Sequence, residues 1–149
     1  MISVPGAIRC PSRYAQAKMI DHTELSALFP RKISPTDLDF VIEMRGHMLF
    51  GEFKFSDTEL PFGQRQCLTK LVMANPKFSA FVASHNVPNG GTIISSVCLI
   101  EEAFFWHRGD FKQAKISRSI YLEELCRAWI CQIEPPTAEY AFLAAFGID

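Results

Sequence analysis

Three carboxylates and one amine stand close together in an otherwise apolar stretch of the sequence. Asp37 and Asp39 lead into a run of apolar residues, and Glu52 and Lys54 flank Phe53 further along. Burying an unpaired charge is costly, so charges within apolar strands usually have a partner. Carboxylate oxygens are the ligands that Mg²⁺ prefers, and a bound ion lowers the pKa of a coordinated water. These residue types therefore predict a metal site that activates water.

A β-hairpin is the element that brings these charges together. Arg45-Gly46 is the expected turn because glycine permits a positive φ, and a two-residue loop there pairs residues whose numbers sum to 91. Asp39 then lies opposite Glu52, and Asp37 opposite Lys54, with all four side chains on one face of the hairpin. A four-residue loop keeps this register, whereas a three-residue loop places the acids on opposite faces.

The pattern resembles the PD-(D/E)xK nuclease superfamily, which includes restriction endonucleases, Holliday-junction resolvases and recombination exonucleases. Its signature is an acid on one strand and (Asp/Glu)-x-Lys on the next, antiparallel strand. Here Pro35-Thr36-Asp37-Leu38-Asp39 matches the first half and Glu52-Phe53-Lys54 the second. The resemblance covers residues 35–72. It implies an α/β fold with a restriction-endonuclease-like mixed sheet flanked by helices.

The resemblance also implies an activity, that of a Mg²⁺-dependent endo- or exodeoxyribonuclease, with Mn²⁺ able to substitute. Asp39 and Glu52 would hold the metal, and Asp37 is the alternative or assisting ligand. Lys54 would orient the attacking water or stabilise the phosphate. DNA is the implied partner, and small nucleases of this kind often cut both strands as homodimers.

A helix expected over residues 61–75 adds one more candidate. Proline suits the first turn of a helix, and an apolar stripe follows it. The stripe consists of Cys67, Leu68, Leu71 and Val72. Gln64 shares this face, and many members of the resembling family carry a glutamine there, close to the metal or phosphate. Its other interpretation is an ordinary polar residue at a helix start. Arg65 could contact a phosphate or face solvent, and the solvent-facing position is the one expected.

Other functions fit the same residues. The charges can belong to a solvated surface hairpin, or the chain can be a catalytically inactive nuclease-fold module of a phage or mobile element that grips DNA or protein. A metal-dependent phosphohydrolase that is not a nuclease is a third possibility. The net charge of −1 argues against a general nucleic-acid binder unless basic residues cluster. Two such clusters are Arg9, Arg13, Lys18, Arg31 and Lys32, and Arg108, Lys112, Lys115 and Arg118.

Composition sets the outer bounds. A chain of 149 residues, with 48% hydrophobic and 21% charged residues, is expected to form a single nuclease-like domain over residues 1–149. No apolar run is long enough to span a membrane, and the N-terminus lacks a signal-peptide pattern. Five cysteines without CxxC spacing are typical of reduced thiols, so a cytoplasmic protein is expected.

The remaining elements are expected from periodicity and turn residues. Helices are expected over 12–29 (in one or two pieces, with Leu25, Leu28 and Phe29 facing inward), 61–75, 117–133 and 140–146, and strands over 38–44, 48–55, 78–84, 92–100 and 103–107.

Overall fold

The computed structural model describes residues 21–32 and 36–134. The chain divides into two compact units, Met1–Thr36 and Asp37–Asp149. In the first unit, the helix α2 (Thr23–Ser26) is followed by the 3₁₀ turn η1 (Pro30–Lys32). The helix expected over 12–29 is therefore only one turn long in its described part. One turn cannot present an apolar stripe, and the expected inward residues Leu25, Leu28 and Phe29 are exposed. The single-domain expectation stays a prediction.

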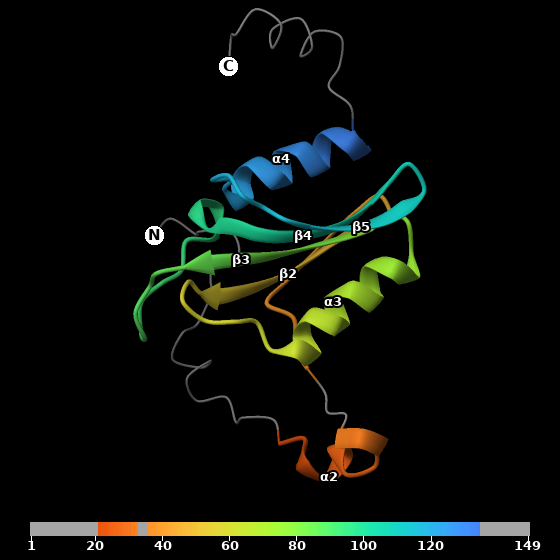
Figure 1. Ribbon diagram of the computed structural model, residues 1–149, viewed down its shortest axis with the longest axis vertical. Helices are drawn as coiled ribbons and strands as arrows, with labels where there is room; N and C mark the ends of the chain where they lie inside the picture. The colour runs from red at the N-terminus through yellow and green to blue at the C-terminus, as the bar shows by residue number, and fades with distance from the viewer. Residues whose placement is uncertain (1–20, 33–35, 135–149) are drawn as a thin grey trace, which may run out of the picture. The chain divides into compact units, whose positions relative to one another are not determined.

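The second unit contains a five-stranded mixed sheet with strand order β1-β2-β3-β4-β5 (Figure 1). The strands are β1 (Phe40–Met44), β2 (His47–Phe55), β3 (Phe78–His85), β4 (Leu99–His107) and β5 (Asp110–Lys115). The strands β2 and β3 are parallel and are joined through α3 (Phe62–Ala74), while all other neighbours are antiparallel. The expected α/β fold, a mixed sheet flanked by helices, is confirmed.

Two hydrophobic cores lie on opposite faces of this sheet. On one face, Leu68 and Val72 of α3 pack with Phe50, Val82 and Phe104. On the other face, α4 (Leu122–Ile133) packs against β2, β3 and β4. The buried residues of this second core include Leu49, Phe81, Ala83, Ile100, Leu122 and Trp129. Alternation along each strand thus divides the central sheet into an α3 face and an α4 face.

The first hairpin has the register that the sequence predicts. Phe40 pairs with Gly51 and Met44 with His47, so paired residue numbers sum to 91. Arg45 and Gly46 turn the chain with φ values of 52° and 79°. Two consecutive positive φ angles are the geometry of a type I′ turn, which matches the twist of the strands.

A close aromatic contact fixes the middle of β2. The Phe81 ring lies directly over Gly51, where an added Cβ would come within 2.1 Å of the ring Cζ. The rings of Phe40 and Phe53 meet the Phe81 ring edge to face, with centroids 5.3 and 5.8 Å away. Glycine is therefore required beside Glu52 because a buried ring occupies the side-chain space.

The second half of the sheet differs from expectation. The segments 92–100 and 103–107 do not form two strands, because one strand, β4, begins at Leu99 after the 3₁₀ turn η2 (Ser95–Val97). The strand β5 lies within the second basic cluster, where no strand is expected, and joins β4 through Arg108 and Gly109, both with positive φ. The helix expected from 117 begins at Leu122. The helix expected over 140–146 lies outside the described residues.

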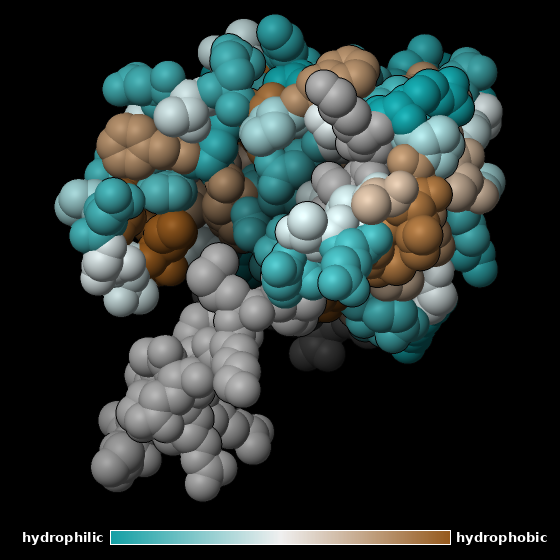
Figure 2. Space-filling view, turned by 90° about the horizontal axis from the view of Figure 1, so that it is seen from below, coloured by the Kyte–Doolittle hydropathy of each residue, from teal (hydrophilic) through white to brown (hydrophobic). Residues whose placement is uncertain are grey.

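The surface is mixed in character. On the face drawn in Figure 2, hydrophobic patches stand between hydrophilic areas. Phe62, at the start of α3, is 77% exposed. None of the helices in the described ranges has the length and apolar character needed to cross a membrane.

Candidate functional site

Glu52 lies at the centre of the candidate site, in the middle of β2. Its side chain shares the α3 face with Phe50, and only 2% of the residue is exposed. Asp39 directly precedes β1, one position beyond the last paired residue, and so faces Glu52 across the hairpin. Asp39 Oδ2 accepts a hydrogen bond from the Phe53 amide at 2.9 Å. The hairpin therefore brings the two predicted metal ligands together.

The buried carboxyl of Glu52 is strongly perturbed. Burial, followed by a hydrogen bond to Asp39 and the negative charges of Asp39 and Asp37, raises the pKa of Glu52 from 4.5 to about 8. Its Oε1 atom is buried and has no hydrogen-bond partner among the described residues. Two carboxyls in contact, one of which is buried, need either a shared proton or a cation. At neutral pH without metal, Glu52 therefore carries the proton.

The number of acids that converge limits the kind of ion that fits. Within residues 21–32 and 36–134, no three His, Cys, Asp or Glu side chains gather closely enough to hold one ion. Asp37 is exposed and acts on Glu52 through its charge. The donor set is thus the Asp39–Glu52 pair, with one carboxylate oxygen unsatisfied. Mg²⁺ suits such a set, because it is commonly held by one or two carboxylates and keeps several waters.

Lys54 lies on the same face of β2 as Glu52, and its side chain is 10% exposed. Its ammonium donates to the Thr58 carbonyl at 2.6 Å and forms an ion pair with Glu101 Oε2 at 2.7 Å. Glu101 reaches it because β4 carries an irregularity opposite Val82 and Ala83. Such an irregularity redirects side chains of the bulged strand. In this arrangement the positive charge of Lys54 is held by Glu101.

A second ionic cluster lies on the α3 face, and the sequence pattern did not predict it. Glu102 is buried, pairs with Arg65 of α3, and accepts a hydrogen bond from Gln113 Nε2 at 2.6 Å. The expectation that Arg65 faces solvent is wrong, because the buried carboxylate needs a cation and Arg65 supplies it. The sequence feature that could have indicated this cluster is the presence of two adjacent acids, Glu101 and Glu102, within an apolar segment. The sequence pattern did not show which residues would neutralise them.

The other candidates have simpler surroundings. Gln64 lies in the first turn of α3 and is half-buried, directly before Arg65. Of the second basic cluster, Lys115 pairs with Glu102 in the β4–β5 ladder and so projects to the α3 face, whereas Lys112 projects to the other face. In the first cluster, Arg9, Arg13 and Lys18 lie outside the described residues.

Comparison with known proteins adds no family to this geometry. No protein-family model, no curated protein and no solved structure matches the chain.

Proposed function

We propose that this chain is a metal-dependent nuclease that hydrolyses phosphodiester bonds of DNA. The observation that carries the proposal is the contact between the buried carboxyl of Glu52 and the exposed Asp39, in which Glu52 Oε1 has no hydrogen-bond partner among the described residues. A buried carboxyl that is kept next to a second carboxyl lowers the stability of the protein, and a functional ligand explains why it is kept there. A cytoplasmic location and action on DNA as a homodimer belong to the same proposal.

In this proposal Asp39 and Glu52 hold Mg²⁺ or Mn²⁺, and Asp37 raises the local negative charge. When bound, the ion acidifies a coordinated water and neutralises charge on the phosphate. Glu52 gives up its proton on ion binding, since a protonated carboxyl is a poor ligand. The hydrogen bond from the Phe53 amide holds Asp39 in place at 2.9 Å.

Lys54 brings positive charge to the scissile phosphate, and can orient the attacking water through a hydrogen bond. Its ammonium contacts Glu101 at 2.7 Å, so a phosphate must compete with that carboxylate for it. Gln64 supplies amide donors at the start of α3. Lys115, on the same face of the sheet, is suited to contact the DNA backbone.

Cleavage assays test the proposal directly. Linear, circular, single-stranded and branched DNA are incubated with Mg²⁺ or Mn²⁺ and wild-type protein, Glu52→Ala or Lys54→Ala. We expect metal-dependent cleavage by the wild type and its loss in both variants. Matched controls are Glu59→Gln, whose side chain is 95% exposed, and Lys70→Met on the exposed side of α3. Equal cleavage by wild type and both site variants would contradict the proposal.

One observation favours the second candidate function, a nuclease-fold module that binds DNA or a protein without cutting. The ion pair between Lys54 and Glu101, together with the bond to the Thr58 carbonyl, gives Lys54 a structural role. Thermal shift with Mg²⁺ separates the two functions, because an ion that binds the native state raises the melting temperature. The nuclease proposal requires a shift that Glu52→Ala abolishes, and the binding module requires none.

A further inference from the structure

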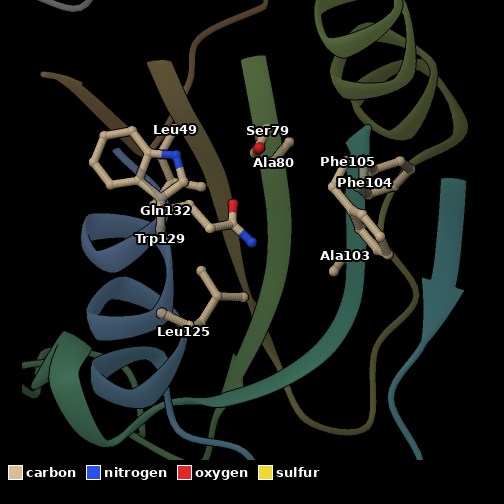
Figure 3. Close-up of a pocket in the computed structure, with 10 residues that line it drawn as sticks. Leu49, Ser79, Ala80, Ala103, Phe104, Phe105, Leu125, Trp129 and Gln132 are labelled. Carbon is tan, nitrogen blue, oxygen red and sulfur yellow. The ribbon is translucent and has the colours of Figure 1, made fainter. Parts of the chain in front are cut away.

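A groove on the α4 face of the sheet has no part in the proposed nuclease site. Its inner half is a hollow of about 220 Å³ between α4 and the strands β3 and β4 (Figure 3). In Figure 3, Leu125, Trp129 and Gln132 extend from α4, while Ala103 and Phe105 lie across from them on β4. This half is mainly apolar. It suits an aliphatic chain, because water between two apolar surfaces makes few hydrogen bonds and is readily displaced.

The outer half of the same groove is polar. It has a volume of about 330 Å³ and shares Ser79, Phe105, Trp129 and Gln132 with the inner half. The polar half adds His47, Lys77 and His107 to the lining. Because four residues belong to both halves, the two hollows form one amphipathic groove, apolar at one end and nitrogen-rich at the other.

The charge of the outer half points to an anionic ligand. Its described lining includes one lysine and two histidines and no acidic residue. Lys77 forms no ion pair with any described residue, and the buried Nδ1 atom of His47 has no hydrogen-bond partner in the same part of the chain. Glu134, which follows the lining residue Ile133, is already paired with Arg45 at 2.8 Å.

We propose that this groove binds a small organic acid with an aliphatic chain. The carboxylate lies at Lys77 and His47, and the chain extends between Trp129 and Leu125. A charge-assisted hydrogen bond to the carboxylate satisfies the lysine, and each CH₂ of the chain that leaves water adds to the affinity. A neutral ligand leaves the cationic end uncompensated, and a cationic ligand is repelled.

Titration with octanoate tests the proposal in the full chain. Trp129 lines both halves and Trp106 lines the outer one, so tryptophan fluorescence reports occupancy, and calorimetry gives the stoichiometry. We expect saturable one-to-one binding of octanoate. Octanamide, the neutral isostere, should bind at least about fivefold more weakly, the factor that corresponds to ~1 kcal/mol of charge pairing. Acetate, which lacks the chain, should not saturate.

Substitutions inside and outside the groove assign the binding to it. Lys77→Gln should weaken octanoate binding but leave octanamide unchanged, whereas Lys70→Gln, an exposed lysine on α3, should change neither. Ala103→Leu fills the inner half and should weaken both ligands. Ala128→Leu, on the exposed side of α4, serves the same purpose if Ala103→Leu does not fold. Equal affinity for octanoate and octanamide, equal effects of the two lysine variants, or absence of saturable binding each overturns the proposal. Glu52→Gln should leave octanoate binding unchanged, so this result is independent of nuclease activity.

Discussion

The acid at position 52 affects the free energy of unfolding as well as any ligand. Its carboxyl has a pKa of about 8 in the folded protein and near 4.5 in the unfolded chain, so the folded state binds the proton more tightly. Folding is therefore favoured at low pH, and stability falls as the pH rises from about 4.5 to about 8. Above pH 8 the carboxylate is charged in both states and the loss is complete.

Glu52→Gln should remove this pH dependence. The amide resembles the protonated carboxyl in shape and can still donate to Asp39, but it cannot become charged. In EDTA, the variant should melt close to wild type at pH 5 and clearly above it at pH 9, with ~1 kcal/mol corresponding to about 2–4 °C for a chain of this length. Differential scanning calorimetry of both proteins between pH 5 and pH 9 measures this difference in melting temperature. A constant difference at all pH values would show that Glu52 does not titrate between these limits.

Ion binding should release a proton from the same residue. Below pH 8 the Glu52 carboxyl is protonated, and a bound cation displaces that proton. Calorimetric titration with Mn²⁺ at pH 7, in two buffers of different ionisation enthalpy, should give close to one proton released per ion. At pH 9 the release should approach zero and the affinity should be higher. The same proton count at pH 7 and pH 9 would place the ion elsewhere.

Glu101 should control how freely Lys54 meets a phosphate. Glu101→Gln removes the competing negative charge while keeping a hydrogen-bond acceptor at the position now 2.7 Å from the ammonium. In a Glu52→Gln background, which prevents cleavage, we expect DNA to bind up to about fivefold more tightly, the effect of ~1 kcal/mol. Fluorescence anisotropy measures the affinity.

Glu123→Gln is the matched control for this charge change. Glu123 is an exposed acid of α4, paired with Arg127 at 2.8 Å on the other side of the sheet. An equal gain from Glu101→Gln and Glu123→Gln would mean that only net charge matters.

At the level of elements, the first hairpin was predictable and the last was not. The register of β1 and β2 follows from local information, namely a glycine that permits positive φ and a period of two in the flanking residues. The β4–β5 hairpin has a similar turn at Arg108 and Gly109. However, three of the six residues of β5 are charged, so its pattern did not indicate a strand. Its strand conformation depends on pairing with β4, which is a tertiary effect.

The candidate site, like the hairpins, was predictable only where local sequence sets its geometry. Asp39 and Glu52 meet because a local turn sets their register. Glu101 reaches Lys54 only through the irregularity in β4, and Arg65 reaches Glu102 across 37 residues of sequence. Neither contact leaves a periodic signal. The residues that pair with the buried charges could therefore not be predicted from the sequence and are known only from the structure.

A single methyl group should test the packing of β2. Gly51→Ala places Cβ within 2.1 Å of Phe81 Cζ, and the buried ring has little room to move. We expect a loss of about 1–3 kcal/mol in the free energy of unfolding, the usual cost of overpacking. Gly63→Ala, in α3, adds a Cβ that meets no other described residue within 4 Å and should be stabilising by up to ~1 kcal/mol. Urea denaturation of both variants gives the comparison, and equal effects would show that the Phe81 contact is unimportant.

For the second unit as a whole, two functions are proposed on opposite faces of one sheet. The Asp39–Glu52 pair lies with the α3 core, and the amphipathic groove lies with α4. The strands β2, β3 and β4 contribute to both faces, since alternate residues point in opposite directions. The family resemblance implied the mixed sheet with flanking helices, and periodicity predicted several of its strands and helices. Neither predicted the groove, because its lining comes from several separate segments.

The amide of Phe53 reports on the position of Asp39. Its proton is bonded to a side chain that lies just outside the β1–β2 ladder, so it exchanges with solvent only when that carboxylate swings away or the strand end frays. The exchange rate of the Phe53 amide proton, followed by NMR, therefore measures how often the Asp39 carboxylate moves away from this amide. Saturating Mn²⁺ would broaden the signal, whereas diamagnetic Mg²⁺ should slow the exchange and leave the resonance sharp.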